Sequence, residues 1–387
     1  MSAVLRAPFE VRFAVLPPLS IYAHLPWCVR KCPYCDFNSH ERAGELPERE
    51  YVQALAADLE GLLPSVWGRR VSSVFIGGGT PSLFSPESID ALLSALRARV
   101  MLEPGAEVTL EANPGTAEAG RFRGYREAGV NRLSLGIQSF AGAKLAALGR
   151  IHSAHEARRA IEMAQASFEN VNLDLMYGLP EQTLEQAQAD VREALTFGTT
   201  HLSAYQLTLE PNTVFYRKPP PLPAHDETAD MQLAVEETLG AAGFEHYETS
   251  AFARAGRRCR HNLNYWEFGD YLGLGAGAHG KVSFADRVTR HARAKQPREY
   301  LAQAGSVVEK AIPAKELPFE FMLNALRLVE GVPAALFEER TGLPAATVAR
   351  KLADARERGL LEDDPLRIRP SARGRLFLNE LLQLFLD

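Results

Sequence analysis

Short apolar runs rich in β-branched and aromatic residues alternate with longer amphipathic segments up to about residue 209. Each run has the length of a buried strand and precedes a segment whose apolar residues have helical spacing. The predicted strands are 20–25, 72–77, 107–112, 132–137, 170–177 and 201–209, and the clearest helices are 46–63, 86–100, 141–166 and 183–197. Ser85 before Pro86 marks a helix start, and Gly129 and Gly198 stand where helices end.

Six strand–helix units predict a parallel sheet. Such units, joined by right-handed crossovers, form either a barrel or an open wound sheet, and six are fewer than the eight of a complete barrel. We therefore predict an α/β fold built on a partial (β/α)6 barrel of the TIM type, extending over residues 18–245.

The alternation stops after a proline-rich connection at 219–223. Residues 247–288 are rich in glycine and aromatic residues, and we expect them to form a small sheet at the barrel edge. Helices at 319–329, 335–341 and 345–358, an extended piece at 368–371 and a last helix up to 386 then resemble a winged helix. No dense basic face accompanies them, so a helical cap without a DNA role is favoured. The predicted domains are 1–245 and 246–387.

The composition is that of an ordinary globular protein, with 46% apolar and 24% charged residues. A net charge of −5 indicates no general polyanion-binding surface, so nucleic acid is not an expected partner. No run reaches about 18 apolar residues, and Glu10 and Pro17 interrupt the segment where a signal core would lie. These features predict a cytoplasmic protein without a transmembrane segment.

Three of the four cysteines, Cys28, Cys32 and Cys35, form a C-x-x-x-C-x-x-C motif directly after the first predicted strand. In a parallel barrel this is the end where active sites lie. Closely spaced thiolates suit an iron–sulfur cluster, because a short loop can reach three corners of a cube. Three ligands leave one iron open to the amino and carboxylate groups of S-adenosylmethionine, whose reductive cleavage gives a 5'-deoxyadenosyl radical. Structural zinc is the alternative, although it usually shows paired C-x-x-C knuckles and four ligands.

With Tyr34 before Cys35, this motif resembles that of the radical S-adenosylmethionine superfamily. The resemblance extends over nearly the whole chain to the oxygen-independent coproporphyrinogen III oxidase group, and within that group to the HemW-type heme chaperones. It implies a 4Fe-4S cluster held by Cys28, Cys32 and Cys35, with S-adenosyl-L-methionine bound beside it.

The resemblance also implies which residues meet S-adenosylmethionine. The glycine run 77–79 is similar to the family's loop at the methionyl amino group, whereas by itself it indicates only a tight turn. Polar residues follow at the ends of predicted strands, and an arginine offers a fork for a carboxylate. The implied set is Tyr22, Tyr34, Gly77, Gly78, Gly79, Thr80, Glu111, Gln138, Arg150 and Asp174.

Two departures from the coproporphyrinogen oxidases bear on activity. Those enzymes carry an extra cysteine two positions after the third, where this chain has Phe37. They also have a longer segment before the motif, whereas 27 residues precede Cys28 here. Both differences argue against porphyrinogen decarboxylation.

The sequence His261-Asn262-Leu263-Asn264-Tyr265-Trp266 reproduces the H-N-x-x-Y-W stretch that marks the heme chaperones. The resemblance makes His261, Tyr265 and Trp266 candidate heme contacts, because imidazole ligates iron and aromatic rings offer flat apolar surface. The nearby Cys259 is a second candidate ligand, and Arg257, Arg258 and Arg260 are candidate partners for the propionates. A core aromatic cluster and a solvated basic loop are the structural alternatives.

We therefore expect a heme chaperone on a radical S-adenosylmethionine scaffold, which binds heme and passes it to an acceptor protein at or near a membrane surface. The alternative is a porphyrinogen oxidase that catalyses an oxidative decarboxylation. A third hypothesis is a DNA-binding regulator with the cluster as sensor, for which salt-dependent binding to duplex DNA is the discriminating observation.

Overall fold

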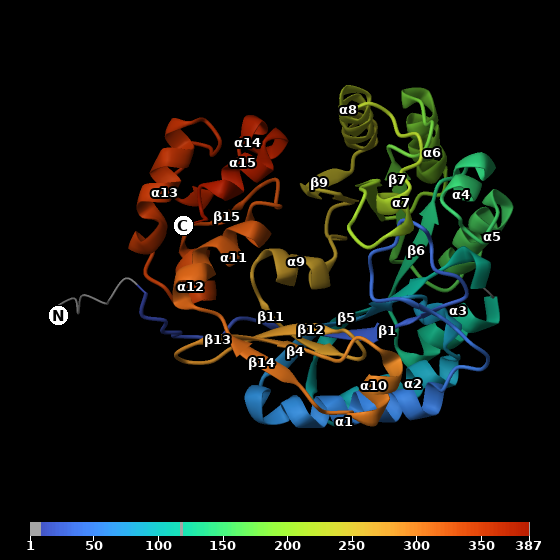
Figure 1. Ribbon diagram of the computed structural model, residues 1–387, viewed down its shortest axis with the longest axis horizontal. Coiled ribbons are helices and arrows are strands. Elements are labelled where there is room, and N and C mark those ends of the chain that lie inside the picture. The colour runs from blue at the N-terminus through green and yellow to red at the C-terminus, as the bar shows by residue number, and fades with distance from the viewer. Residues whose placement is uncertain (1–8, 117–118, 387) are drawn as a thin grey trace.

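The computed structural model describes residues 9–116 and 119–386. Its centre is a row of six parallel strands that are hydrogen-bonded in chain order, as predicted for a partial (β/α)6 barrel (Figure 1). These strands are β1 (Leu19–Leu25), β4 (Arg70–Gly78), β5 (Met101–Ala112), β6 (Arg132–Gln138), β7 (Val171–Tyr177) and β8 (His201–Gln206). A short parallel pair, β2 (Trp27–Cys28) and β3 (His40–Glu41), follows β1.

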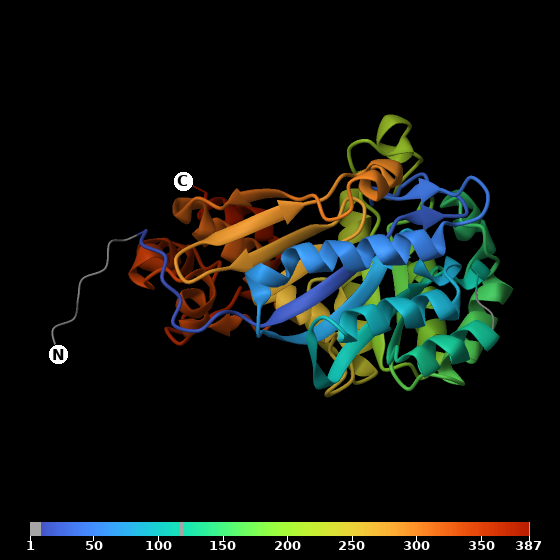
Figure 2. The same cartoon turned by 90° about the horizontal axis from the view of Figure 1, so that it is seen from below.

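Helices cover the outer face of these strands (Figures 1 and 2). They are α1 (Glu48–Val66), α2 (Pro86–Arg97), α3 (Ala119–Ala128), α4 (Gly142–Ala147), α5 (Ala154–Gln165), α6 (Leu184–Thr196) and α8 (His225–Ala241), with the short α7 (Val214–Arg217) and the 3-10 turns η1 (Pro81–Leu83) and η2 (Pro114–Thr116) in the connections. The predicted start of α2 is confirmed, because the Ser85 side chain accepts a hydrogen bond from Ser88 N. The predicted helix ends at Gly129 and Gly198 are also confirmed by positive φ angles of 110° and 64°.

The prediction of one continuous helix over 141–166 is wrong. The structure has α4 and α5 with a break between them, because Gly149 adopts a φ of 67° and Ser153 forms a capping box with Glu156 that starts a new helix. This break places Arg150 at the carboxyl end of the strands rather than on the outside of a helix.

Alternate residues of the strands face opposite sides of the sheet, which separates an apolar outer layer from a polar interior. On β1, Ile21 and Ala23 are fully buried in the core that also contains Tyr51 and Leu55 of α1. The intervening Tyr22 points to the other side, where its hydroxyl lies 2.9 Å from His24 Nδ1. The polar residues inside the barrel are therefore set by strand alternation.

Residues after 244 extend the same sheet at both edges. β9 (Glu245–Glu248) and β10 (Ala251–Ala253) pair antiparallel beside β8, and β11 (Asp270–Leu274) pairs parallel with β1. β12 (His279–Ser283), β13 (Val288–Ala292) and β14 (Val308–Ala311) continue from β11 as antiparallel strands. The expected small sheet at the barrel edge is thus part of one 12-stranded sheet. The domain division between 245 and 246 stays a prediction.

The remaining helices form a layer beside the barrel with its own apolar core, which includes Phe321 and Phe337 (Figure 1). Its elements are α11 (Leu317–Ala325), α12 (Ala335–Thr341), α13 (Ala346–Glu357), α14 (Ala372–Leu376) and α15 (Leu378–Gln383), with the antiparallel pair β15 (Val332–Pro333) and β16 (Arg367–Ile368). α10 (Pro297–Ala302) and η3 (Ala314–Glu316) precede this layer, and α9 (Arg260–Trp266) lies between it and the strands β1 and β4.

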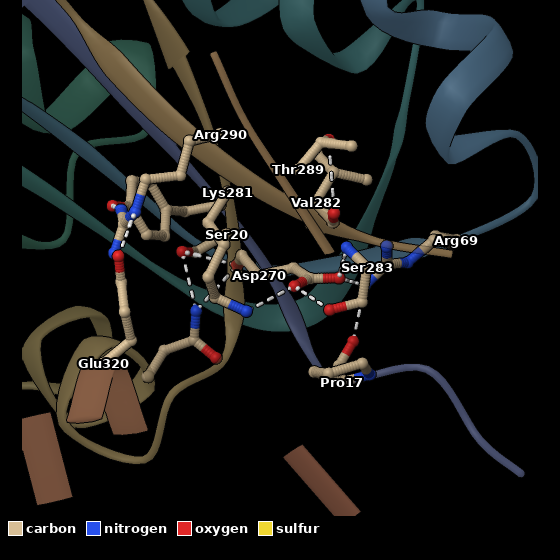
Figure 3. Close-up of polar contacts among 12 residues, drawn as sticks. Pro17, Ser20, Arg69, Asp270, Lys281, Val282, Ser283, Thr289, Arg290 and Glu320 are labelled. Atoms are coloured by element: carbon tan, nitrogen blue, oxygen red, sulfur yellow. Dashed lines mark hydrogen bonds and ion pairs between the residues drawn. The ribbon is translucent and has the colours of Figure 1, made fainter. Parts of the chain in front are cut away.

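A buried carboxylate, Asp270, fastens the added strands to the barrel (Figure 3). Its side chain is fully buried and lies 2.8 Å from Lys281 Nζ and 2.9 Å from Arg69 Nη2. Ser283 donates to it from both its backbone N and its hydroxyl. Although burial opposes ionisation, Lys281 and Arg69 lower the pKa of Asp270 below its usual value, so the carboxylate is charged at neutral pH.

A second ion pair, between Arg290 and Glu320, connects β13 to α11 in the same region (Figure 3). None of the helices in residues 9–116 and 119–386 combines the length and apolar character of a membrane-spanning segment.

Candidate cluster and cofactor site

The three motif cysteines lie in the loop after β1, and each sulfur meets a different polar side chain. Thr80 Oγ1 donates to Cys28 Sγ at 3.4 Å, and Arg150 Nη1 donates to Cys32 Sγ at 3.7 Å. The Ser39 hydroxyl lies 3.5 Å from Cys35 Sγ. Burial raises the pKa of the Cys28 and Cys35 thiols, and these donors oppose that rise by stabilising thiolate.

The three motif cysteines line one cavity, and the fourth cysteine lies apart from them. Cys259 is fully buried elsewhere, where its Sγ donates to Glu107 Oε1 at 3.4 Å. Three cysteines at one cavity suit a 4Fe-4S cluster with one open iron.

A cavity of about 330 Å³ adjoins the cysteine loop at the carboxyl ends of the strands. Every residue predicted to meet S-adenosylmethionine lines it except Tyr22 and Gly77. Those two lie behind its wall, where the Tyr22 ring stacks on Phe75 and a Cβ at Gly77 would meet Glu111 Oε2 at 3.0 Å. The other eight residues share one cavity, and their contacts with S-adenosylmethionine stay predictions.

Glycine is required at Gly78, which ends β4, and at Gly79, which follows it, because neighbouring backbone approaches closely. Gly78 has a φ of 124°, and a Cβ there would lie 2.9 Å from Leu25 O. A Cβ at Gly79 would lie 2.6 Å from Trp27 O. Side chains at these positions would therefore collide with β1 and β2 rather than point into the cavity, so substituting Gly78 tests folding before it tests ligand binding.

Two half-buried carboxylates, on β5 and β7, face this cavity. Glu111 Oε2 accepts a hydrogen bond from Gly78 N at 3.1 Å, while Asp174 accepts from Ser134 Oγ at 3.0 Å and from Asn172 Nδ2 at 2.8 Å. Burial, followed by repulsion from Asp174, raises the pKa of Glu111 to about 8, and burial also raises the pKa of Asp174. A ligand that brings positive charge and hydrogen-bond donors is therefore favoured here.

Gln138 and Arg150 also line the cavity, and Arg150 reaches the cysteine loop. Gln138 ends β6 at a register shift and has a φ of 67°, an uncommon conformation for a residue with a side chain. Arg150 Nη2 donates to Gly136 O at 2.8 Å, which holds the guanidinium between β6 and the cysteine loop. This cation is placed to pair with a ligand carboxylate or a cluster thiolate.

Sequence reasoning missed several residues that line the cavity. They include Ser134 and Met176, which share a strand face with Gln138 and Asp174, and Tyr205 and Gln206 at the end of β8. Strand alternation would have identified Ser134 and Met176, because residues two or four positions apart face the same side. Arg30 also lines the cavity, and the Leu207–Glu210 segment contributes Leu207, Thr208 and Glu210.

The candidate heme segment lies at the other end of the barrel interior. His261 is 1% exposed, its Nδ1 lies 3.0 Å from Ser73 Oγ near the start of β4, and its ring contacts Phe75 and Tyr265. Arg327 covers the ring of Trp266 at 4.3 Å. Protein groups therefore occupy the ring surfaces that were expected to meet a macrocycle.

Two of the nearby arginines are paired at the surface. Arg258 bridges Glu245 and Glu330, and Arg260 lies 3.6 Å from Glu103. The structure does not bring these side chains, or Cys259, to the cysteine loop. The cluster candidates and the heme candidates are thus two separate groups in one barrel.

Comparison with known proteins identifies the family. Residues 22–194 match the model of the radical SAM superfamily, and residues 312–377 match that of the HemN C-terminal domain. The chain is 49% identical to the heme chaperone HemW of Haemophilus influenzae over 96% of this chain and 98% of that protein. It is also 49% identical to HemW of Escherichia coli, over 96% of this chain and 99% of that protein.

Among solved structures, coproporphyrinogen III oxidase (HemN) of Escherichia coli superposes with a TM-score of 0.80. The match covers 96% of this chain and 90% of that protein at 23% identity, and it confirms the predicted fold. The near-complete likeness to the two chaperones confirms the family that the cysteine and H-N-x-x-Y-W motifs indicate. The chain belongs to the HemW heme chaperone family, within the radical SAM superfamily.

Proposed function

We propose that this chain binds heme and passes it to an acceptor protein, on a scaffold that holds a 4Fe-4S cluster and S-adenosylmethionine. The observation that carries this proposal is the 49% identity to proteins named heme chaperones over almost their whole length. The matches cover 98% and 99% of those relatives.

In this proposal Cys28, Cys32 and Cys35 hold the cluster, and the adjoining cavity holds the cofactor. Bound together, these two groups supply one-electron chemistry at the sulfonium. The chain's own residues orient the cofactor: Glu111 pairs with its ammonium group and Asp174 accepts from its hydroxyls. Thr80 and Arg150 each donate a hydrogen bond to one of the three sulfurs.

A carrier role is favoured over an oxidase role by the residue beside the cysteine loop. Phe37 stands where the related oxidases have an extra cysteine, and it lines the cavity with 61% of its surface exposed. A phenyl ring provides neither a thiol hydrogen nor a ligand. It does provide apolar surface at the mouth of the site.

Binding of S-adenosylmethionine is expected to strengthen as the pH rises from 6 towards 8. The pKa of Glu111 is raised to about 8, so the free carboxyl is mostly protonated at pH 6 and must lose its proton before pairing with an ammonium group. The affinity should rise by up to about tenfold per pH unit and level off near pH 8. Equilibrium dialysis of the reconstituted protein across this range measures the slope.

The Glu111→Gln variant is the matched control for this pH dependence. It keeps the shape of the side chain but has no proton to lose, so its affinity should be lower at pH 8 and nearly constant across the range. An equal slope in the two proteins would show that another group controls binding.

We propose that heme meets His261 when α9 moves away from the strands. His261 Nε2 has no hydrogen-bond partner in the described part of the chain, and burial lowers the pKa of the imidazole to about 3. The ring is therefore neutral and keeps a lone pair for iron. His261→Ala should weaken heme binding by about tenfold or more and shift the Soret band, while the cluster absorption stays unchanged.

His291→Ala is the control, because His291 is 2% exposed and its Nε2 also lacks a partner among the described residues, yet it lies on β13. Heme titration of both variants separates loss of a ligand from loss of a buried histidine. Equal heme affinity in wild type and His261→Ala would exclude this ligand.

The acceptor protein and the compartment belong to the same proposal. We place the activity in the cytoplasm, because free thiols at Cys28, Cys32 and Cys35 suit a reducing environment. If the acceptor lies at a membrane surface, heme should leave the loaded protein only when membranes are added. If the acceptor is in solution, heme transfer should not require membranes.

A further inference from the structure

A chain of buried hydrogen bonds runs through the barrel interior from the cavity to α9. On β7, Asn172 Nδ2 donates to Asp174 Oδ1 at 2.8 Å. Asn172 Oδ1 lies 2.6 Å from His201 Nδ1 on β8, and His201 Nε2 lies 2.8 Å from the hydroxyl of Tyr247 on β9. Cys259 N then donates to that hydroxyl oxygen at 3.3 Å. Four side chains thus connect the cavity to the residue that precedes α9.

The donors in this chain all point towards Asp174. An ionised carboxylate only accepts, so the amide nitrogen of Asn172 faces it and the amide oxygen faces His201. His201 Nδ1 must therefore carry a hydrogen. Burial, together with Arg132, lowers the pKa of His201 well below its ordinary value, so the ring is neutral and Nε2 accepts from the Tyr247 hydroxyl.

At its far end, the chain holds the first turn of α9. Cys259 is the residue before the first residue of α9, and its Sγ donates to Glu107 Oε1 at 3.4 Å. His261 N donates to the same oxygen at 3.2 Å. Tyr247 and Glu107 together therefore satisfy two backbone N–H groups and one thiol at the start of α9. Each of these groups is buried, so α9 cannot leave without exposing or replacing them.

We infer that Asn172, His201 and Tyr247 are positioning residues that couple occupancy of the cavity at Asp174 to the seating of α9. This inference rests on the proposed function in one respect, namely that S-adenosylmethionine contacts Asp174. A ligand that donates to Asp174 favours its ionised form, which is the stronger acceptor, and each bond in a chain polarises the next. Occupancy of the cavity therefore holds α9 more tightly, and a tightly held α9 raises the affinity of the cavity by the same factor.

The other ionisable groups near Asp174 are Glu111 on β5, Arg132 on β6 and Tyr205 on β8. None of them lies in the chain to α9. A substitution at Tyr247 leaves all three in place, so it changes the coupling without changing the charges around the carboxylate.

Hydrogen exchange of the Cys259 and His261 amides measures the seating of α9 directly. In the anaerobically reconstituted protein, saturating S-adenosylmethionine should slow exchange of these two amides by about fivefold or more. In Tyr247→Phe the amides should exchange faster without ligand, and the added ligand should change their rates by less than about twofold.

Tyr125→Phe is the matched control, because Tyr125 is also fully buried and its hydroxyl donates to Phe84 O at 2.7 Å, outside the chain. It should keep the full response to S-adenosylmethionine. His201→Phe is a second variant, which cuts the chain at its centre. It should give the same result as Tyr247→Phe, so either variant provides the test if the other folds poorly.

Binding of S-adenosylmethionine to wild type with no change in the α9 amides would overturn the inference, as would a full response in both Tyr247→Phe and His201→Phe. Absence of S-adenosylmethionine binding in wild type is a different result, because it contradicts the proposed function itself. Equilibrium dialysis on the same samples distinguishes the two.

Discussion

Replacing Cys28, Cys32 and Cys35 together with alanine is expected to reduce the iron content of the anaerobically reconstituted protein from about four per chain to near zero. These three sulfurs lie at one cavity, and the fourth cysteine is fully buried away from it with its thiol donating to Glu107. No other thiol can replace them. Iron and sulfide analysis, together with visible absorption, measures the loss.

Cys259→Ala is the control for this experiment. Burial raises the pKa of the Cys259 thiol to about 12, so it stays protonated and is a poor metal ligand. The variant should keep its full iron content. Loss of iron in Cys259→Ala, or retention in the triple variant, would show that the ligand set is wrong.

Replacing Asp270 with asparagine is expected to lower the free energy of unfolding by about 3–5 kcal/mol. The substitution keeps the size of the side chain but leaves Lys281, which is 1% exposed, without its anionic partner. A buried cation without a partner is costly, whereas the pair itself contributes little relative to apolar residues. Chemical denaturation monitored by circular dichroism measures the change.

Two further variants test the cause of this destabilisation. Asp286→Asn breaks an exposed pair with Arg287 on the adjacent turn and should change stability by no more than about 1 kcal/mol. Asp270→Leu combined with Lys281→Met should recover part of the loss, because it removes the buried ammonium group and leaves only Arg69, whose side chain is 12% exposed, without its anion. A double variant less stable than Asp270→Asn would show that the Lys281 charge is not the main cause of the loss.

The sequence predicts the barrel well because each of its parts is encoded locally. The parallel strands are short runs rich in apolar residues, and glycines and capping residues such as Ser85 mark the helix ends. The family resemblance adds the roles expected of the cysteine loop and of Glu111, Gln138 and Asp174, and the structure places these residues at one cavity. The error at 141–166 has a local cause as well. The sequence contains the S-x-x-E pattern of the capping box at Ser153. This pattern lies inside a long amphipathic segment, which favoured the prediction of one continuous helix.

Other features depend on contacts between distant segments. The parallel pairing of β11 with β1 joins Asp270 to Leu19, and no periodicity indicates it. Strand alternation predicts that Asn172 and His201 face the interior, but it cannot show that they connect Asp174 to Tyr247 and α9. The burial of His261 also depends on contacts with distant segments. The H-N-x-x-Y-W stretch by itself is equally compatible with an exposed binding segment.

We expect this chain to carry heme and not to oxidise porphyrinogens. The most direct test incubates the anaerobically reconstituted protein with hemin and, separately, with coproporphyrinogen III, S-adenosylmethionine and a reductant. We expect heme to remain bound through gel filtration and coproporphyrinogen III to keep all its propionates when analysed by mass spectrometry. Loss of carboxyl groups from coproporphyrinogen III, with no heme retained, would contradict the claim and establish an oxidase despite Phe37.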